Sequence, residues 1–310
     1  MLKFILKKLF IAVTIIFTIA TCTFFLTNAF HEAPFVNDKT LDLETLKNLQ
    51  HMYGLDKSLF VRYCDFLKGL MCLDFGYSYS NIGVPIHDLI FPADQNSGLI
   101  ISLRYCLIVF IVVTILGILI GIVSSINNGV LDKIITLFTV LGFSIPTIIL
   151  GPILIQIFGV QLKWFPTCQW NFDFQHLFLP VLTLSFSILC YLSQVEKMNL
   201  SDIMNSQFIK MARAKGLTRK HIILKHALRP AFIPVVGYLG SIISNILTGM
   251  VIIERLFGLP GIGNLTINAA LSRDFPMMLA LIIIFSVIFV LSNIVVDVFY
   301  VLIDPKVKFD

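Results

Sequence analysis

SDIMNSQFIKMARAKGLTRKHIILKHALR, residues 201–229, is a polar segment set between long apolar runs. It contains seven Lys and Arg residues and a single acid, Asp202. A charge buried in hydrocarbon costs several kcal/mol even on permissive insertion scales, so this segment cannot cross a bilayer. We therefore expect it to lie in water between two membrane spans.

The segment has helical signals of its own. Residues 206–214 are predicted to form a short helix with Phe208, Met211 and Ala212 on one face, at i, i+3 and i+4 spacing. Gly216 is predicted to end this helix, because glycine takes the left-handed conformation that closes a helix at little steric cost.

A second helix is predicted to follow directly. Thr218 is a suitable N-cap for a helix that runs from His221 to Leu228. Ala214 and Gly216 leave little side-chain bulk at the turn, so a partner could approach the backbone closely while the flanking bases meet its acidic groups. The segment is thus interpreted as a docking site. An ordinary positively charged cytoplasmic loop is the alternative that charge alone leaves open.

The composition of the whole chain is that of a membrane protein. Of its 310 residues, 57% are hydrophobic and 13% are charged, whereas about 45–50% apolar residues is usual for soluble domains. The mean hydropathy is +0.90. The net charge of +5 is explained by bases that gather in cytoplasmic loops, so no nucleic-acid partner is implied.

Apolar runs and charge predict an all-α polytopic protein whose two ends are cytoplasmic. The N-terminal helix is assigned to residues 1–30, an extracytoplasmic helical insertion to 31–98, a five-helix core to 99–303 and a tail to 304–310. The six predicted spans are residues 9–28, 98–125, 134–160, 176–200, 230–253 and 276–303. Fourteen of the 23 bases then lie on the cytoplasmic side. A cleaved signal peptide is the alternative for the first run.

Two regions leave structural alternatives open. The third span contains Pro146 and Pro152, for which a simple kink is favoured over an interrupted helix that exposes backbone groups around a substrate. In the insertion, Leu43, Leu46 and Tyr53 indicate an amphipathic helix. Further along, Cys64 and Cys72 lie eight residues apart, about 12 Å along a helix, which is beyond the reach of a disulfide unless the chain breaks at Gly69.

Motifs for catalysis or metal binding are not found in the sequence. It has no HExxH, GxSxG or GxxxxGK[ST] motif and no CxxC pair. Its spans carry few charges, with Asp297, Gln194 and Glu196 as the main polar exceptions. An ion-driven carrier normally needs charged residues within its spans, so we expect a transport component that draws energy from a partner. An ion-coupled transporter and, less favoured, a membrane enzyme remain as alternatives.

Several motifs resemble one transporter family. Residues 210–216, KMARAKG, followed by 226–229, HALR, resemble the cytoplasmic "EAA" signature of binding-protein-dependent ABC importer permeases, in the version found in oligopeptide and dipeptide permeases. The general signature has Glu-Ala-Ala at 210–212 and Leu-Pro at 228–229, and both departures look like the peptide branch. YGLDK at 53–57, DFGYS at 74–78 and ERLFGLPGIG at 254–263 extend the resemblance over nearly the whole chain.

The resemblance implies a type I ABC importer permease fold in the bacterial cytoplasmic membrane and a di- or oligopeptide substrate, with nickel or another peptide-like solute as the alternative. The implied partners are a second homologous permease, two ATP-binding subunits, an extracytoplasmic solute-binding protein and the lipid bilayer. ATP and Mg would be used by the ATP-binding subunits, with no cofactor, metal or catalytic residue on this chain. The residues that the resemblance assigns to coupling with the ATPase are Phe208, Lys210, Met211, Ala212, Arg213, Ala214, Lys215, Gly216, Leu217, His226, Ala227, Leu228 and Arg229. It assigns no substrate-binding residue.

Overall fold

The computed structural model describes residues 2–29, 43–92, 97–127, 129–167 and 173–303. Within these ranges every regular element is a helix, and the β contacts are limited to an isolated bridge between Tyr77 and Pro85. Five helices are long and apolar enough to cross a membrane, and a bent pair of shorter helices makes a sixth span when the pair is counted as one. The prediction of an all-α polytopic protein is confirmed.

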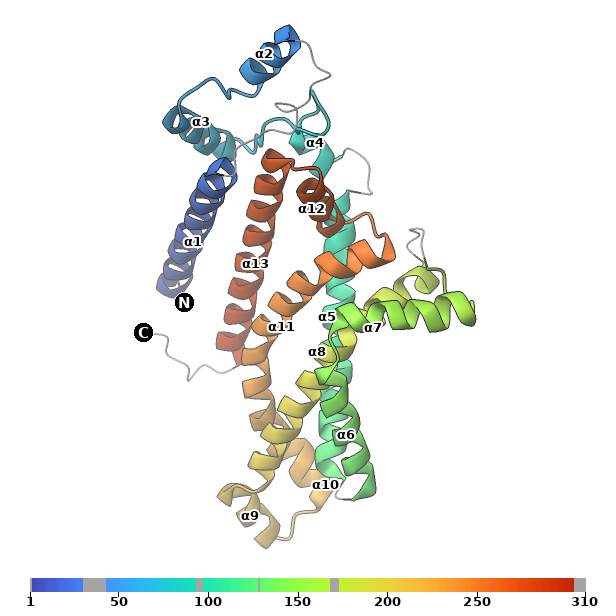
Figure 1. Ribbon diagram of the computed structural model, residues 1–310. Coiled ribbons are helices and arrows are strands. Elements are labelled where there is room, and N and C mark those ends of the chain that lie inside the picture. The colour runs from blue at the N-terminus through green and yellow to red at the C-terminus, as the bar shows by residue number, and fades with distance from the viewer. Residues whose placement is uncertain (1, 30–42, 93–96, 128, 168–172, 304–310) are drawn as a thin grey trace. The chain divides into compact units, whose positions relative to one another are not determined.

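The long helices correspond to the predicted apolar runs (Figure 1). They are α1 (Leu2–Ala29), α5 (Gly98–Ile126), α8 (Phe174–Met204), α11 (Leu228–Phe257) and α13 (Phe275–Ile303). The bent pair consists of α6 (Val130–Ser144) and α7 (Thr147–Leu154), the latter continued by the π-helical segment η2 (Ile155–Gln161). The shorter helices are α2 (Leu43–Met52), α3 (Leu59–Met71), α4 (Ile86–Ile90) and α12 (Ile262–Leu271).

The chain divides into two compact units. The cap unit comprises Met1–Leu103 and Pro260–Val290, and the core unit comprises Arg104–Leu259 and Leu291–Asp310. Helices α5 and α13 each contribute one part to each unit. Each compact unit is therefore built from two stretches that are far apart in the sequence.

An aromatic cluster holds the cap unit together. Ala20 and Phe24 of α1 pack with Leu279 and Ile283 of α13, and Phe66 of α3 stacks on Phe24 with ring centroids 5.2 Å apart. This burial of large apolar surfaces joins three helices that are distant in sequence.

The insertion contains helix α2 where an amphipathic helix was predicted, although Tyr53 lies just beyond its end. Helix α2 starts at Leu43, and its buried residue is Leu49, which packs against Tyr53. The side chains of Leu43 and Leu46 lie outside the described residues. Cys64 and Cys72 are both free, in agreement with the predicted separation along a helix.

Helix α8 is the central element of the core unit, and it packs against α6, α7 and α11. Small residues on its neighbours allow this close packing. A Cβ atom added at Gly121 of α5 would lie 2.7 Å from both the carbonyl oxygen of Ser193 and the Cβ of Glu196. Tyr105, fully buried on α5, donates a hydrogen bond of 2.9 Å to the carbonyl oxygen of Pro180.

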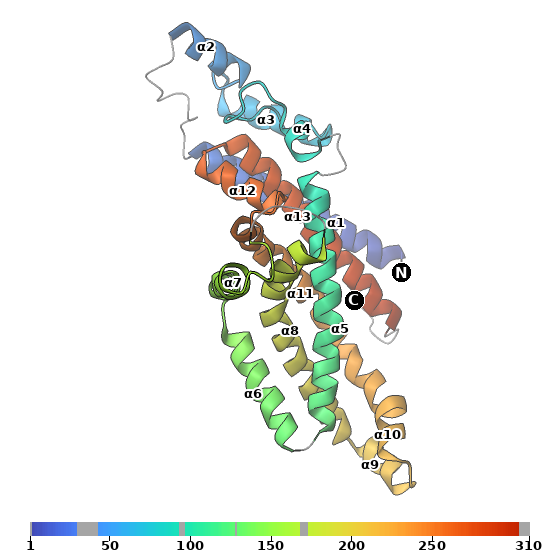
Figure 2. The same cartoon turned by 90° about the vertical axis from the view of Figure 1, so that its right-hand side faces the viewer.

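The favoured simple kink in the third span is wrong. Helices α6 and α7 are bent by 102°, which is visible in Figure 2, where α7 is seen end-on and α6 from the side. Ile145 has an extended backbone, with φ −86° and ψ 117°, because the ring of Pro146 disfavours the helical conformation in the residue before it. The hydroxyl of Ser187 donates a 2.8 Å hydrogen bond to the carbonyl of Ile145, a group that the break frees.

One carboxylate ties together α5, α6 and α8. Asp132 accepts hydrogen bonds of 2.6 Å from both the Ser124 hydroxyl and the Lys197 ammonium group. Lys197 also donates to the Thr136 hydroxyl at 2.5 Å. The neighbouring Glu196 differs, because it is only 1% exposed and neither carboxylate oxygen has a hydrogen-bond partner among the described residues.

Candidate functional site

The polar segment forms a helical hairpin at one end of the core unit, drawn at the bottom of Figure 1. Its first helix, α9 (Gln207–Ala214), begins after Ser206, as the sequence predicts. Gly216 has φ +78°, the left-handed conformation that was expected to end this helix. The second helix, α10 (Arg219–His221), follows Thr218, whose side chain makes no capping hydrogen bond.

The prediction that the second helix and the fifth span are separate is wrong. Helix α10, the π-helical segment η3 (Ile222–Ala227) and α11 form one continuous helix, Arg219–Phe257. Pro230 lacks the N–H that an α-helix would bond to the carbonyl of residue 226. The wider π-helical turns immediately before this proline accommodate the mismatch without breaking the helix.

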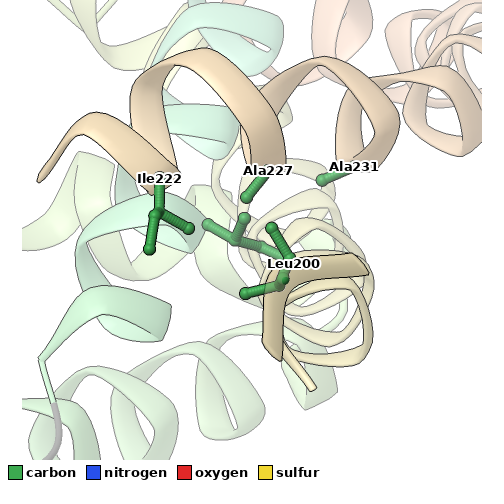
Figure 3. Close-up of a cluster of buried hydrophobic side chains, with 5 residues drawn as sticks. Leu200, Ile222, Ala227 and Ala231 are labelled. Atoms are coloured by element: carbon green, nitrogen blue, oxygen red, sulfur yellow. The ribbon is translucent and has the colours of Figure 1, made fainter. Parts of the chain in front are cut away.

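A buried cluster fixes the base of the hairpin. Leu200 of α8, Ile209 of α9, and Ile222, Ala227 and Ala231 of the long helix are each at most 1% exposed. Figure 3 shows Leu200 lying among the labelled side chains of the long helix. The hairpin is thus a packed extension of the core unit.

The inner face of α9 is not the face that carries Phe208 and Met211. Ile209 is the buried residue and Ala212 packs beside its cluster, whereas Phe208 is 41% and Met211 62% exposed. The alternative stripe through Ile209 and Ala212 also has helical spacing, and local periodicity cannot choose between the two. The result is that two large apolar side chains remain on the outer surface of the hairpin.

The tip of the hairpin is exposed throughout, since each residue from 213 to 221 belongs to the exposed class. Leu217 at the tip and Leu224 one turn beyond it are further exposed apolar residues. Arg219 donates a 2.7 Å hydrogen bond to the carbonyl of Ile126, at the end of α5. Arg213 donates a longer one, 3.4 Å, to the carbonyl of Met204. Both contacts hold the tip against its own unit through backbone carbonyls.

The predicted coupling residues fall into three groups. Half-buried residues are Ala212, His226 and Leu228, and Ala227 is fully buried, so it cannot touch a partner in this conformation. The exposed ones are Phe208, Lys210, Met211, Arg213, Ala214, Lys215, Gly216, Leu217 and Arg229. The exposed set mixes cations with apolar side chains, which is the chemistry of a protein contact surface.

Comparison with known proteins places the whole chain in one family. The family model described as "Binding-protein-dependent transport system inner membrane component" matches residues 113–309. A second model, for the N-terminal part of the membrane component of binding-protein-dependent transport systems, matches residues 1–114. The two models together extend over both compact units.

Individual relatives match from end to end. The oligopeptide transport system permease protein OppB of Haemophilus influenzae is 35% identical over 100% of both chains, and OppB of Escherichia coli K12 is 34% identical over the same shares. The dipeptide transport system permease protein DppB of Bacillus subtilis is 31% identical over 99% of this chain and 98% of its own. With its apolar helices, this chain therefore belongs to the multi-pass inner membrane components of binding-protein-dependent transport systems.

Proposed function

We propose that this chain is one permease subunit of an ATP-driven importer of di- and oligopeptides, and that the hairpin of residues 206–229 receives the ATP-hydrolysing subunit. The names of its relatives support the substrate class, since they are permeases of oligopeptide and dipeptide systems. The exposed hairpin tip supports the second half of the proposal and is the observation that carries it.

The hairpin combines a base that is packed against the core unit with an exposed contact surface. Its base is held by the cluster around Ile209 and Ile222, while Phe208 and Met211 expose apolar surface beside the cations. Large exposed side chains of this kind mark interaction sites when they gather in one place. The cations complement an acidic rim on the partner and steer its approach.

Gly216 is the point of closest access. It has φ +78°, and a Cβ atom added there would meet nothing within 4 Å. The space beside the turn is therefore open to a partner's backbone or side chain. A large side chain at this position would fill that space without disturbing the hairpin's own packing.

Membership of the family supports a particular assembly. This chain pairs with a second, homologous permease, and two ATP-binding subunits engage the two hairpins from the cytoplasm. An extracytoplasmic solute-binding protein delivers the peptide on the opposite side. Both termini of this chain are then cytoplasmic. ATP and Mg belong to the ATP-binding subunits, and this chain supplies half of the translocation path without a catalytic group.

The test is Gly216→Trp, with Gly216→Ala as the matched control. Both variants carry the strain of a side chain at positive φ, roughly 1 kcal/mol, but only Trp fills the space that we assign to the partner. The measurements are co-purification of the ATP-binding subunits, ATPase activity stimulated by the loaded binding protein, and peptide uptake in proteoliposomes. Gly216→Trp is expected to abolish all three, while Gly216→Ala keeps most of each. Wild-type uptake in Gly216→Trp would refute the docking role, and absence of ATP-dependent peptide uptake in the wild type would refute the transport function.

A further inference from the structure

The break between α6 and α7 opens a cavity in the core unit. The cavity has a volume of about 280 Å³ and is bounded by the residues of the break together with α8 and α11. Its lining residues are Phe143, Ile145, Pro146, Thr147, Leu184, Ser187, Ile188, Tyr191, Asn245 and Gly249. Interrupted helices in transporters surround their substrates in this way, because the interruption exposes backbone groups that a regular helix would consume.

Several polar groups at this cavity have unused hydrogen-bonding capacity. Among the described residues, the hydroxyls of Thr147 and Tyr191 and the amide of Asn245 make no hydrogen bond. The carbonyl of Ile145 accepts one bond, from Ser187, and an oxygen of this type has a second lone pair. The lining of the cavity thus offers both donors and acceptors.

The lining contains no Asp, Glu, Lys, Arg or His. The site therefore offers only neutral dipoles between apolar walls and holds no fixed charge to pair with a charged side chain of a peptide. Its volume lies slightly below the range of about 300–1,000 Å³ for pockets that enclose a whole small molecule. Both features fit a segment of an extended polar chain that passes along the wall.

We propose that this cavity is a contact point for the main chain of the translocated peptide, in which Asn245, Tyr191 and Thr147 exchange hydrogen bonds with peptide amide groups. The inference rests on the proposed function and adds a substrate-facing site to it. Amide groups are common to every peptide, so such a wall binds the backbone without selecting the side chains. A wall without charge also lets acidic and basic peptides pass alike.

The experiment places opposite charges at one position of the assembled transporter in proteoliposomes. Asn245→Asp and Asn245→Lys are compared with the wild type for uptake of a tripeptide of lysine and a tripeptide of glutamate, each at a saturating concentration with the binding protein present. Asn245→Asp is expected to raise the lysine-to-glutamate uptake ratio about fivefold, which corresponds to ~1 kcal/mol. Asn245→Lys is expected to lower it by a similar factor.

The two variants control for each other, because a general loss of folding lowers the uptake of both peptides and leaves the ratio unchanged. Tyr191→Phe, which removes a single hydroxyl, is expected to lower the uptake of trialanine severalfold while ATP-binding subunits still co-purify.

An unchanged lysine-to-glutamate uptake ratio in both charge variants, with an active wild type, would overturn the contact point and leave the import function intact. Cross-linking of a cysteine at position 245 to the second permease throughout the transport cycle would also overturn it, since the wall would then be a subunit interface. A wild type that transports no peptide contradicts the proposed function instead.

Discussion

The carboxylate of Asp274, immediately before α13, accepts a hydrogen bond from the hydroxyl of Ser78, a residue 196 positions earlier in the chain. The same carboxylate accepts bonds from the backbone N–H groups of Tyr79, at 3.1 Å, and Ser80, at 3.2 Å. Asp274 is 2% exposed, and Ser78 is fully buried. A single acidic side chain thus secures the loop before α4 to the start of the last span.

Asp274→Ala is expected to release this loop. Several donors would lose their acceptor, and unsatisfied buried groups cost about 1–3 kcal/mol each, so we expect the local stability of the cap unit to fall by roughly 3 kcal/mol. Hydrogen exchange of the backbone around residues 78–81 measures the change. Asp88→Ala is the control, because the Asp88 side chain is 67% exposed and its ion-pair partner among the described residues is the adjacent His87, at 3.4 Å. Equal exchange in the two variants would contradict the anchoring role.

Tyr79 gives the cap unit a dependence on alkaline pH. Burial is the main cause that raises the pKa of Tyr79 to about 12, and Arg62 opposes the shift in part. Because the folded state favours the neutral phenol, its contribution to stability is complete below pH 10 and is lost as the pH rises through 12. The difference in tyrosinate absorbance between the wild type and Tyr79→Phe reports this group alone. A midpoint near 12 is expected, and one near 10 would show that the ring is not buried.

The core unit contains two carboxylates whose replacement by a neutral amide should change the stability of the protein in opposite directions. Asp132 has three side-chain donors around it, whereas Glu196 has none among the described residues. Asp132→Asn removes the ion pair with Lys197, and it is expected to lower the free energy of unfolding by about 1–3 kcal/mol. Glu196→Gln removes a buried charge without a partner and is expected to raise the melting temperature of the purified transporter by a few degrees. If Glu196→Gln lowers the melting temperature instead, Glu196 has a partner in the assembly.

Close helix packing at Gly121 gives a further prediction. A Cβ atom there would lie 2.7 Å from a backbone oxygen of α8, an atom that cannot move aside as a flexible side chain could. Gly121→Ala is therefore expected to lower the free energy of unfolding by about 1–3 kcal/mol and to lower the melting temperature. Gly129→Ala is the matched control, because a Cβ atom at Gly129 meets nothing within 4 Å. Equal melting temperatures in the two variants would show that α5 and α8 are less tightly packed.

Local signals were sufficient for the spans and for much of the hairpin. The length of the apolar runs placed all the long helices. Gly216 marked the turn, because the left-handed backbone conformation of the turn favours glycine whatever lies around it. The choice of Ile209 as the inner residue of α9 was not predictable, since it depends on the distant Leu200 and Ile222. The break at Pro146 was also not predictable, because a proline that kinks a helix and a proline that interrupts it look the same in the sequence. The bend is stabilised by Ser187, which lies on another helix.

The continuity of the helix Arg219–Phe257 has a mechanical consequence. Its 39 residues measure about 58 Å at 1.5 Å per residue, and they carry the hairpin tip at one end and Asn245 well along its length. In the proposed function, a displacement of the tip by the ATP-hydrolysing subunit would reach the cavity lining through this helix, with no loop in between. The π-helical turns at Ile222–Ala227 are the one stretch of this helix with a different register. The proposed docking site for the ATP-hydrolysing subunit and the proposed peptide contact at Asn245 therefore lie on one continuous helix.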